Sequence, residues 1–406
     1  MDFDDSPAEA AFRLEARAFL EAHAKPKDPA SVGHSGGLVA GSEAEKQHVR
    51  EAQQWQALLY DNGWAGITWP KEYGGRGGTS VQQMIWNQEL AKFDAAPGVF
   101  AQGIGMAGPT LIKHGSDAQK ARFLGPMLRG DELWCQLFSE PGAGSDLAAL
   151  STKAVQDGDE WVVNGQKVWT SSAHYCDWGI LLTRTNVDVP KHQGITYFLV
   201  DMRSPGIDIR PLHQITGIAH FNEVFLTDVR IPTENMVGDL NRGWGVTMTT
   251  LTSERTLIGG NAAITSADVI KLVKRSGREH DPVVRDRAAG IVAQMEILKY
   301  MGLRVQTSIS QGTAAGAVSS VLKLGYTKLQ TEFNDFAMSI AGASGMLGAD
   351  DDPGTHRRAQ QFLNQWSSKL GGGTDQVQRN IVGERILGLP GDPRADKDIP
   401  FKDIPR

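Results

Sequence analysis

The period of the hydrophobic pattern changes twice along this chain, and this change constrains the fold more than any other feature. Apolar residues recur at helical spacing up to about residue 131, beginning with Phe12, Ala16 and Leu20 after the capping-box sequence SPAE. From about residue 132, β-favouring runs such as GILLTRTN, GITYFLVDM and NEVFLTDVRIP dominate, and helical spacing resumes from about residue 241. Because helices and strands are segregated rather than alternating, the pattern predicts an α+β fold, mainly α, and argues against a doubly wound sheet.

These changes divide the chain into four parts. We expect an N-terminal helical domain over residues 1–131, a central β-domain over 132–240, a C-terminal helical domain over 241–390 and an extended tail over 391–406. The tail, PGDPRADKDIPFKDIPR, is rich in proline and charge, which favours an extended conformation. Within the β-domain, Asn164-Gly165 stands between two β-favouring runs and predicts a hairpin turn.

The composition excludes several functional classes. The 406 residues are 40% hydrophobic and 22% charged, which is ordinary for a globular protein of two or three packed units. A net charge of −6 without a basic block argues against nucleic-acid binding. No apolar run approaches the roughly 18 residues needed to span a bilayer, and the acidic N-terminus is unlike a secretory signal. Cys135 and Cys176 form neither a disulfide framework nor a CxxC metal site, so the expected location is a reducing cytoplasm.

Two short motifs suggest enzyme classes that their context does not support. GIGMAG, with Gly103, Gly105 and Gly108, matches a dinucleotide fingerprint, but it follows a helical stretch rather than a strand. GHSGG matches the nucleophile elbow of hydrolases, but Ser35 lies in a Gly-, Pro- and Ser-rich stretch predicted to be a linker. Both are interpreted as chance matches, and a serine thioester hydrolase using Ser35 is kept as a remote alternative.

Two segments of the predicted β-domain are suited to an aromatic, phosphorylated ligand. SEPGAGSD, residues 139–146, offers small residues, hydroxyl groups and backbone N–H groups that can approach a planar ring or pyrophosphate oxygens. KVWTSS, residues 167–172, places Trp169 beside three hydroxyl residues, which suits the face and edge of an aromatic ring. The alternatives are a surface turn capped by Ser145 or Asp146, and a core position for Trp169.

Four blocks of sequence, taken together, resemble the acyl-CoA dehydrogenase family. They are GWAGITWPKEYGG, LIKHGSDAQKARFLGPMLRGDELWCQLFSEPGAGSD, NGQKVWTSS and GGTDQVQRNIVGERILGLP, and the resemblance covers about residues 5–390. The final block is similar to the actinobacterial branch that handles fatty acyl-CoA and sterol side-chain thioesters. The resemblance implies an N-terminal helical domain, a central β-barrel-like or sandwich domain and a C-terminal four-helix bundle. It also implies FAD between the last two domains, with part of it contacted by a neighbouring subunit.

Carried over position by position, the resemblance assigns the cofactor and substrate contacts. The residues implied to line the flavin with its ribityl and phosphate groups are Gln136, Phe138, Ser139, Gly144 and Ser145. The residues implied to cover the isoalloxazine are Trp169, Thr170 and Ser171, the last at its N5 edge. The residues implied to contact FAD from the C-terminal side are Thr374 and Gln376. The residues implied to face the acyl-CoA substrate are Ser145, Arg255 and Gly373.

The family's chemistry needs a carboxylate that removes a proton from Cα and donors that bind the thioester oxygen. Many relatives carry the glutamate at the position that Gly372 occupies here, and a glycine cannot abstract a proton. A minority carry it on the first helix of the C-terminal domain, directly before an arginine, where LTSERTLIGG places Glu254 and Arg255. Glu254 is therefore predicted to be the base and Gly372 to donate its backbone N–H. The plain alternative is a solvated Glu-Arg pair.

One departure from the family concerns assembly. An Arg-x-x-Phe-Gly stretch that crosses the subunit interface to the FAD pyrophosphate is replaced here by KRSGREHDPVVRDR, which leaves Arg278 as the substitute candidate. A homodimer or homotetramer that passes electrons to electron-transfer flavoprotein is expected. The alternatives are a heterotetramer with a paralogue, in which this chain is a non-catalytic or half-site subunit, and an oxidase. The acyl group is not specified by the sequence.

Overall fold

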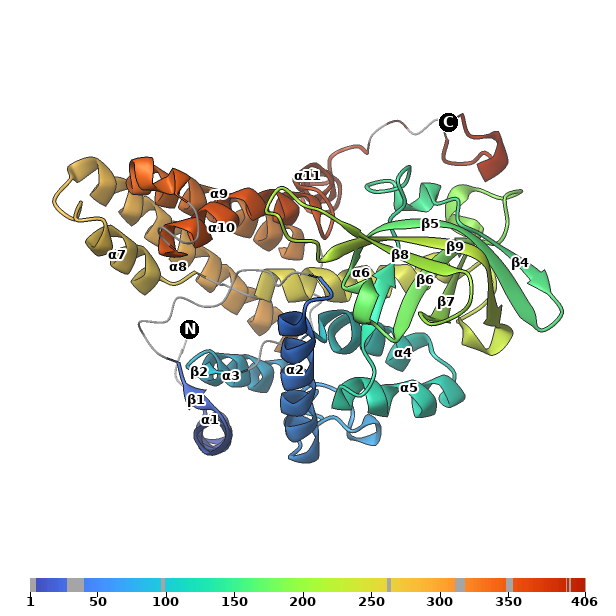
Figure 1. Cartoon of the computed structure of the whole chain (residues 1–406), viewed down its shortest axis with the longest axis horizontal. Helices are drawn as coiled ribbons and strands as arrows, with labels where there is room; N and C mark the ends of the chain where they lie inside the picture. Colours follow the sequence, from blue (N-terminus) through green and yellow to red (C-terminus); the bar gives the residue numbers. More distant parts are fainter. Residues whose placement is uncertain are drawn as a thin grey trace.

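The computed structural model describes residues 5–27, 40–95, 99–260, 264–310, 318–347, 353–391, 393 and 396–405. A helical N-terminal region, a β-sheet region and an elongated bundle of helices follow one another along the chain, as the change of period predicted (Figure 1). The prediction of the fold class is therefore confirmed. No helix in these ranges has both the length and the apolar character needed to cross a membrane.

The N-terminal helices begin at the predicted cap. The Ser6 side chain accepts a hydrogen bond from the Glu9 backbone N–H, and the Glu9 side chain accepts one from the Ser6 backbone N–H, so the capping box is formed. Phe12, Ala16 and Leu20 are all buried, and this stripe packs the first helix against the third. The elements are α1 (Pro7–His23), β1 (Lys25–Pro26), α2 (Glu43–Asp61), α3 (Ser80–Leu90), β2 (Phe93–Asp94), α4 (Gly108–His114) and α5 (Asp117–Arg129). The GIGMAG motif falls in a π-helical turn, Gly103–Ala107, which confirms that it is no dinucleotide fingerprint.

The central region is one sheet, with strands in the order β10-β7-β6-β4-β5-β9-β8 and β3 pairing in parallel with β6. The strands are β3 (Trp134–Leu137), β4 (Lys153–Asp157), β5 (Glu160–Ser171), β6 (Trp178–Arg184), β7 (Ile195–Asp201), β8 (Ile207–Leu212), β9 (Phe221–Pro232) and β10 (Met236–Val237). Strands β6 and β7 are buried almost throughout, and they form the most buried part of the sheet.

The predicted hairpin turn at Asn164-Gly165 is wrong. Strand β5 runs through both residues, and the hairpin closes instead between β4 and β5 at Gly158, whose φ of 67° suits a glycine. The Asn164 amide donates to the Asp228 carboxylate on β9 at 2.9 Å and accepts from the Asp228 backbone N–H at 3.0 Å. Gly165 is needed because a Cβ there would lie 2.4 Å from the Thr152 hydroxyl. The dipeptide therefore marks a sheet irregularity rather than a turn.

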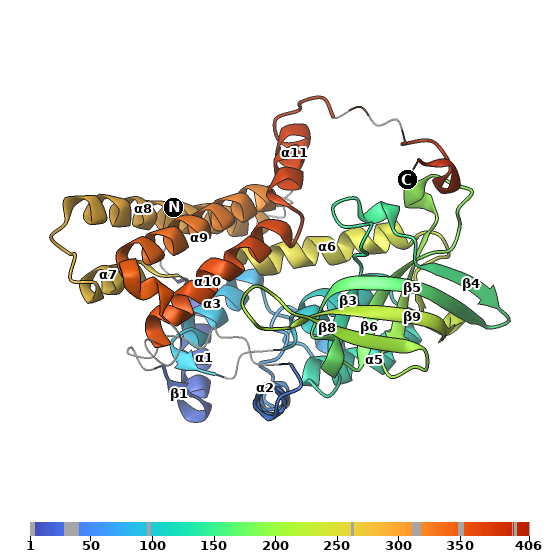
Figure 2. The ribbon, with the colours of Figure 1, turned by 45° about the horizontal axis from the view of Figure 1, so that its top comes forward.

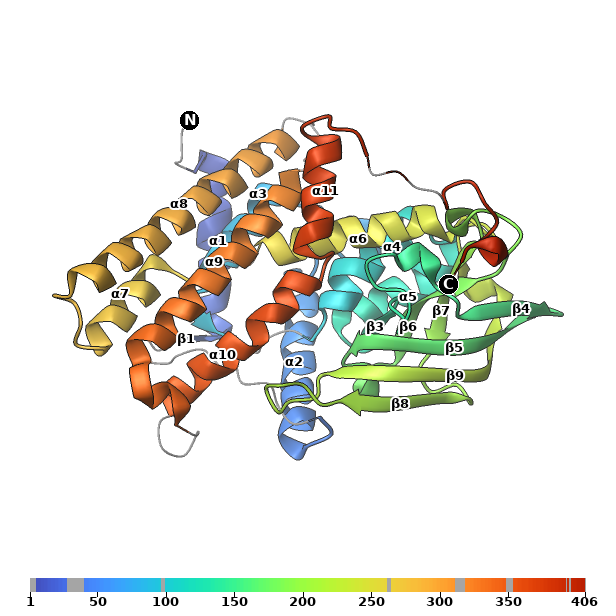
Figure 3. The same ribbon diagram turned by 90° about the horizontal axis from the view of Figure 1, so that it is seen from above.

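The C-terminal region is a bundle reached by one long helix that leaves the sheet (Figure 3). Its helices are α6 (Gly243–Gly260), α7 (Ser266–Arg275), α8 (Pro282–Ser310), α9 (Val318–Ala341), α10 (Pro353–Leu370) and α11 (Asp375–Arg385). Helix α9 packs against α6, α8, α10 and α11, while α6 also packs against β7 and α4. Helix α6 therefore connects the three regions, and a site between sheet and bundle must lie along it.

Candidate functional site

The SEPGAGSD segment, residues 139–146, forms a turn between β3 and the short 3₁₀ helix η3 (Leu147–Ala149), and we call it the signature loop. Its anchor is Glu140, which is buried and lies 2.8 Å from the Nζ of the fully buried Lys167. The backbone N–H groups of Ser151 and Thr152 donate to the two carboxylate oxygens at 2.7 and 2.9 Å. Both oxygens are thus satisfied, as a buried charge requires.

The two charges of this anchor affect each other's titration. Burial alone would raise the pKa of Glu140, but Lys167 and the hydrogen bonds to the carboxylate outweigh it and hold that pKa below its usual value. Burial lowers the pKa of Lys167, and Glu140 opposes that shift. The pair therefore fixes the loop at its base, where it leaves the sheet.

The rim of the signature loop is open. Gly144 has no atom within 4 Å of the position that a Cβ would take, and Ser145 is exposed. Phe138 is buried, while Gln136 and Ser139 are half-buried beside it. A rigid base with an exposed rim of small residues presents backbone groups to a ligand.

Trp169 lies on β5 two residues after Lys167, and its backbone is strained. Its φ is 61°, in the left-handed region that a bulky residue rarely adopts, and the β5–β9 register shifts between Lys167 and Thr170. The side chain is 59% exposed, so the core alternative for Trp169 is wrong. The Thr170 hydroxyl is buried without a hydrogen-bond partner among the described residues, and Ser171 is half-buried. A strained, exposed aromatic beside an unsatisfied hydroxyl fits a planar aromatic ligand.

Residues 371–374, which we call the glycine turn, connect α10 to α11. Gly372 and Gly373 have φ of 64° and 84°, so both need glycine's conformational freedom. The Gly372 carbonyl accepts a hydrogen bond from the Gln378 side chain at 2.8 Å. In the described part of the chain, neither the Gly372 nor the Gly373 backbone N–H has an acceptor. Thr374 caps α11 through the Val377 N–H. The turn therefore offers backbone donors to a ligand.

A second buried ion pair holds the glycine turn from behind. The Nζ of Lys323, a fully buried residue on α9, lies 2.8 Å from Asp375, the first residue of α11. Asp375 also accepts from Thr327 at 3.0 Å and lies 3.3 Å from the Lys369 Nζ. Burial would raise the pKa of Asp375, but Lys323, Thr327 and Lys369 together lower it. Sequence reasoning missed this anchor, although a lysine inside the apolar run SVLKLGY was a visible signal.

Helix α6 presents Glu254 from a buried face. Thr250, one turn earlier, is fully buried, with its hydroxyl 2.8 Å from Thr110 on α4 and 3.2 Å from Tyr197 on β7. Residues four apart share a helix face, so Glu254 continues this face toward the bundle, where it is half-buried. The side chain of Arg255 lies outside the described residues. Figures 2 and 3 place the α10–α11 connection over the C-terminal half of α6.

The residues assigned from the sequence fall into two groups, one in the sheet and one in the bundle, and some lie outside both. The Val168 N–H, directly before Trp169, donates to the Ser139 carbonyl of the signature loop at 2.9 Å, and the glycine turn and α6 share the neighbour α9. Gln376 is exposed on α11. Arg278 lies in the α7–α8 connection at the far end of the bundle from the sheet, paired with Asp281 at 2.6 Å (Figure 1). Ser35 lies outside the described residues.

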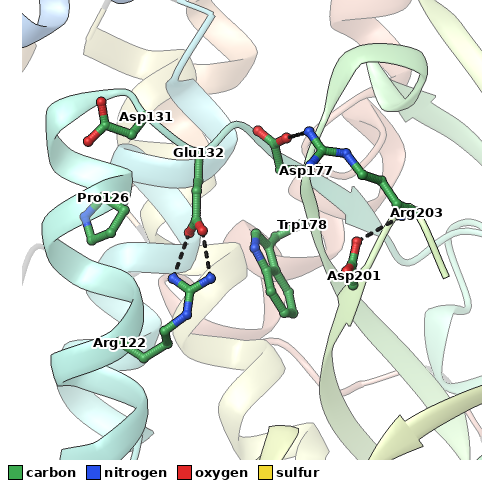
Figure 4. Close-up of a pocket in the computed structure, with 8 residues that line it drawn as sticks. All are labelled: Arg122, Pro126, Asp131, Glu132, Asp177, Trp178, Asp201 and Arg203. Carbon is green, nitrogen blue, oxygen red and sulfur yellow. Dashed lines mark hydrogen bonds and ion pairs between the residues drawn. The ribbon is translucent and has the colours of Figure 1, made fainter.

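A hollow of about 520 Å³ opens where α5 meets the ends of β6 and β7, away from these groups (Figure 4). Its charges are already paired: Arg122 binds Glu132 through two hydrogen bonds and Arg203 binds Asp177. The Arg122 guanidinium also lies 5.6 Å from the ring centroid of Trp178. Because its arginines are occupied by neighbouring carboxylates, this hollow is not a candidate for binding a phosphorylated ligand.

The comparisons with known proteins all point to the same family. Models of the N-terminal, middle and C-terminal domains of acyl-CoA dehydrogenases match residues 6–131, 135–229 and 241–387. The acyl-CoA dehydrogenase IpdE1 of Mycobacterium tuberculosis is 36% identical over 93% of this chain and 97% of its own length. FadE34 of the same organism is 40% identical over 87% of this chain. FadE34 is the longer protein, and this chain spans 48% of its length.

Two similar solved structures contain two different named chains. One is titled the Tcur3481-Tcur3483 steroid ACAD, with a TM-score of 0.82 and 29% identity over 97% of this chain and all of that one. The other is the ChsE4-ChsE5 complex of Mycobacterium tuberculosis, with a TM-score of 0.78 and 30% identity over the same shares.

Proposed function

This chain belongs to the acyl-CoA dehydrogenase family, and from that premise we propose that it converts an acyl-CoA thioester to the trans-2-enoyl-CoA with Glu254 as the base. Membership makes the chain an FAD-dependent oxidoreductase of lipid metabolism. The exposed, strained Trp169 and the open rim of the signature loop fit this cofactor. When bound, FAD supplies the acceptor for the hydride that leaves Cβ.

The FAD contacts proposed for this chain come from the sheet and from the bundle. From the sheet they are Gln136, Phe138, Ser139, Gly144, Ser145, Trp169, Thr170 and Ser171. From the bundle they are Thr374 and Gln376, and Arg278 would reach the cofactor only of another subunit. Ser145 with Arg255 and Gly373 would face the acyl-CoA.

Glu254 and Gly372 are proposed to have different roles toward the thioester. The carboxylate takes the proton from Cα, and the Gly372 N–H donates to the carbonyl oxygen as negative charge develops on it. One observation carries this assignment: the glycine turn has backbone donors without acceptors in the described structure, while its position 372 has no side chain. A carboxylate must therefore come from elsewhere, and the half-buried Glu254 continues a buried face of α6 toward the bundle.

The substrate class is proposed from the relatives, and the electron acceptor from membership of the family. Because a structure with a TM-score of 0.82 is titled a steroid ACAD, we rank steroid-derived acyl-CoA above straight-chain acyl-CoA. The absent side chain at Gly372 leaves room for a bulky acyl group. Electrons pass to electron-transfer flavoprotein rather than to oxygen. The free, buried Cys135 and Cys176 support a cytoplasmic location.

The Glu254→Gln variant tests the base. It should keep its yellow FAD but lose the bleaching that acyl-CoA causes without oxygen, with a rate at least about 10²-fold lower, because the amide cannot take the proton. The matched control is Glu296→Gln on α8, a half-exposed carboxylate beside Lys299 that should bleach normally. Normal bleaching of Glu254→Gln would exclude Glu254 as the base.

A second candidate is a half-site subunit of a heteromeric dehydrogenase. It is favoured by the two solved structures whose titles name two different chains. Purification alone and with a co-expressed paralogue distinguishes the two. A yellow, active protein alone supports the homomer, whereas a colourless protein that becomes yellow only with a partner supports the half-site subunit.

A further inference from the structure

The end of the chain docks on the β-sheet region rather than remaining in solvent. Residues 396–405, which we call the C-terminal segment, return from the bundle to the sheet (Figures 1 and 2). The backbone N–H groups of Phe401 and Lys402 donate to Val189 and Val187 at 2.9 and 3.0 Å. Pro400 pairs with Pro190 as an isolated bridge. These bonds seat the segment beside the connection between β6 and β7.

Phe401 covers a buried arginine. Its ring is 5% exposed and its centroid lies 3.9 Å from the Arg184 guanidinium, which is itself 2% exposed. Arg184 donates to the Ala148 carbonyl at 2.6 Å and to the Leu150 carbonyl at 3.3 Å. Those carbonyls belong to the residues that directly follow the signature loop. Phe401 therefore shields from water the cation that holds the end of this loop.

Lys191 makes a second and direct link. Its Nζ lies 2.7 Å from Asp146, the last residue of the signature loop, and 2.5 Å from Asp396 at the start of the C-terminal segment. The Lys191 carbonyl accepts a hydrogen bond from Arg184 at 2.6 Å. Asp146, Lys191, Arg184 and the C-terminal segment are thus one network, and it contacts Asp146 and the residues that follow the signature loop.

We propose that the C-terminal segment is a latch that holds the signature loop in its binding conformation and thereby strengthens the binding of FAD. Phe401 and Asp396 are positioning residues, because they act through Arg184 and Lys191 rather than by contact with the cofactor. A loop held in its bound conformation loses less conformational entropy when the ligand binds. This inference rests on FAD as the cofactor and on the proposed role of the signature loop, but not on Glu254 as the base.

Three variants of the full chain test the latch: a stop after residue 395, Phe401→Ala and Asp396→Asn. The Kd of FAD for the apoprotein, measured by flavin fluorescence, should rise about tenfold or more for the truncation and less for Asp396→Asn, which leaves Phe401 in place. A synthetic peptide of residues 396–406, added to the truncated protein, should restore binding. The kcat at saturating FAD should stay close to that of the wild type.

Lys402→Ala is the matched control. Lys402 lies in the same segment, but its ammonium pairs at 2.7 Å with Asp188 rather than with Asp146 of the signature loop, so the Kd should not change. If the truncated protein does not fold, the Asp396→Asn variant decides by the same measurement. An unchanged Kd in Phe401→Ala and Asp396→Asn would overturn the latch. A fall in kcat together with a lower unfolding temperature of the apoprotein, and no selective rise in Kd, would show a merely structural role. Loss of bleaching with an unchanged Kd would concern the proposed reaction instead.

Discussion

The signature loop belongs to the β-sheet region and the glycine turn to the bundle, and both are anchored in the same way. In each, a buried lysine pairs with a buried carboxylate next to a turn with backbone groups proposed to face a ligand: Lys167 with Glu140, and Lys323 with Asp375. The two carboxylates differ in the groups that bind them. Glu140 is bound by one lysine and two backbone N–H groups, whereas Asp375 is bound by two lysines and a hydroxyl. The loop is fixed to its own sheet, and the turn depends on how three helices pack.

The largest effect is expected from Lys167→Met. It leaves Glu140 buried without the lysine that pairs with it, which should lower the free energy of unfolding by roughly 3–5 kcal/mol. Chemical denaturation measures the loss, and hydrogen exchange should increase first in residues 139–152. The matched control, Lys153→Met, removes an exposed lysine of β4 and should change stability little.

The double variant Lys167→Met with Glu140→Gln sharpens this test. It removes the buried charge, while the amide oxygen can still accept a backbone hydrogen bond, so part of the lost stability should return. If the double variant were less stable than Lys167→Met, the penalty would not come from an uncompensated carboxylate.

A smaller loss is expected from Lys323→Met. Asp375 keeps Lys369 and Thr327, so its charge stays partly compensated, and the loss should be roughly 1–3 kcal/mol. Hydrogen exchange should increase in α11 and the glycine turn rather than in the sheet. Lys328→Met on the same helix removes an exposed lysine and is the control. A loss equal to that of Lys167→Met would show that the second lysine gives no protection.

The smallest effect is expected in the way that stability depends on acidic pH. The pKa of Asp375 is lowered in the folded protein, so the unfolded chain takes up this proton first as the pH falls below the ordinary value of 3.8. Its contribution to stability is complete at neutral pH and is lost as the pH falls toward the lowered pKa. Denaturation curves of the wild type and Asp375→Asn, compared between pH 7 and pH 3, should therefore converge on the acid side. A constant difference over this range would contradict the shift.

Glu89 also has a lowered pKa, so it contributes to the pH dependence of stability in both proteins of that experiment. Burial alone would raise its pKa, but hydrogen bonds from Arg17, Lys92 and Arg13 lower it to about 2. Because Glu89 lies on α3, away from the glycine turn, it titrates alike in both proteins and cancels from the comparison.

Much of the fold could be predicted because local patterns and packing agree. The capping box at Ser6, the buried stripe of α1 and the rejection of GIGMAG as a nucleotide motif were all confirmed. The hairpin at Asn164-Gly165 failed because that signal depends on the strand opposite: Asp228 and Thr152, both distant in sequence, make this pair a sheet irregularity. The roles of Glu254 and Gly372 remain predictions that the proposed experiments test.

By itself the sequence determined the order of the three regions, the family and the absence of a carboxylate at position 372, because periodicity and motifs are written along the chain. Only the tertiary structure decided what holds the site. Lys323 meets Asp375 across 52 positions, and Lys191 meets Asp396 across 205. No local pattern encodes such pairs, because a buried charge finds its partner only when distant helices and strands pack together.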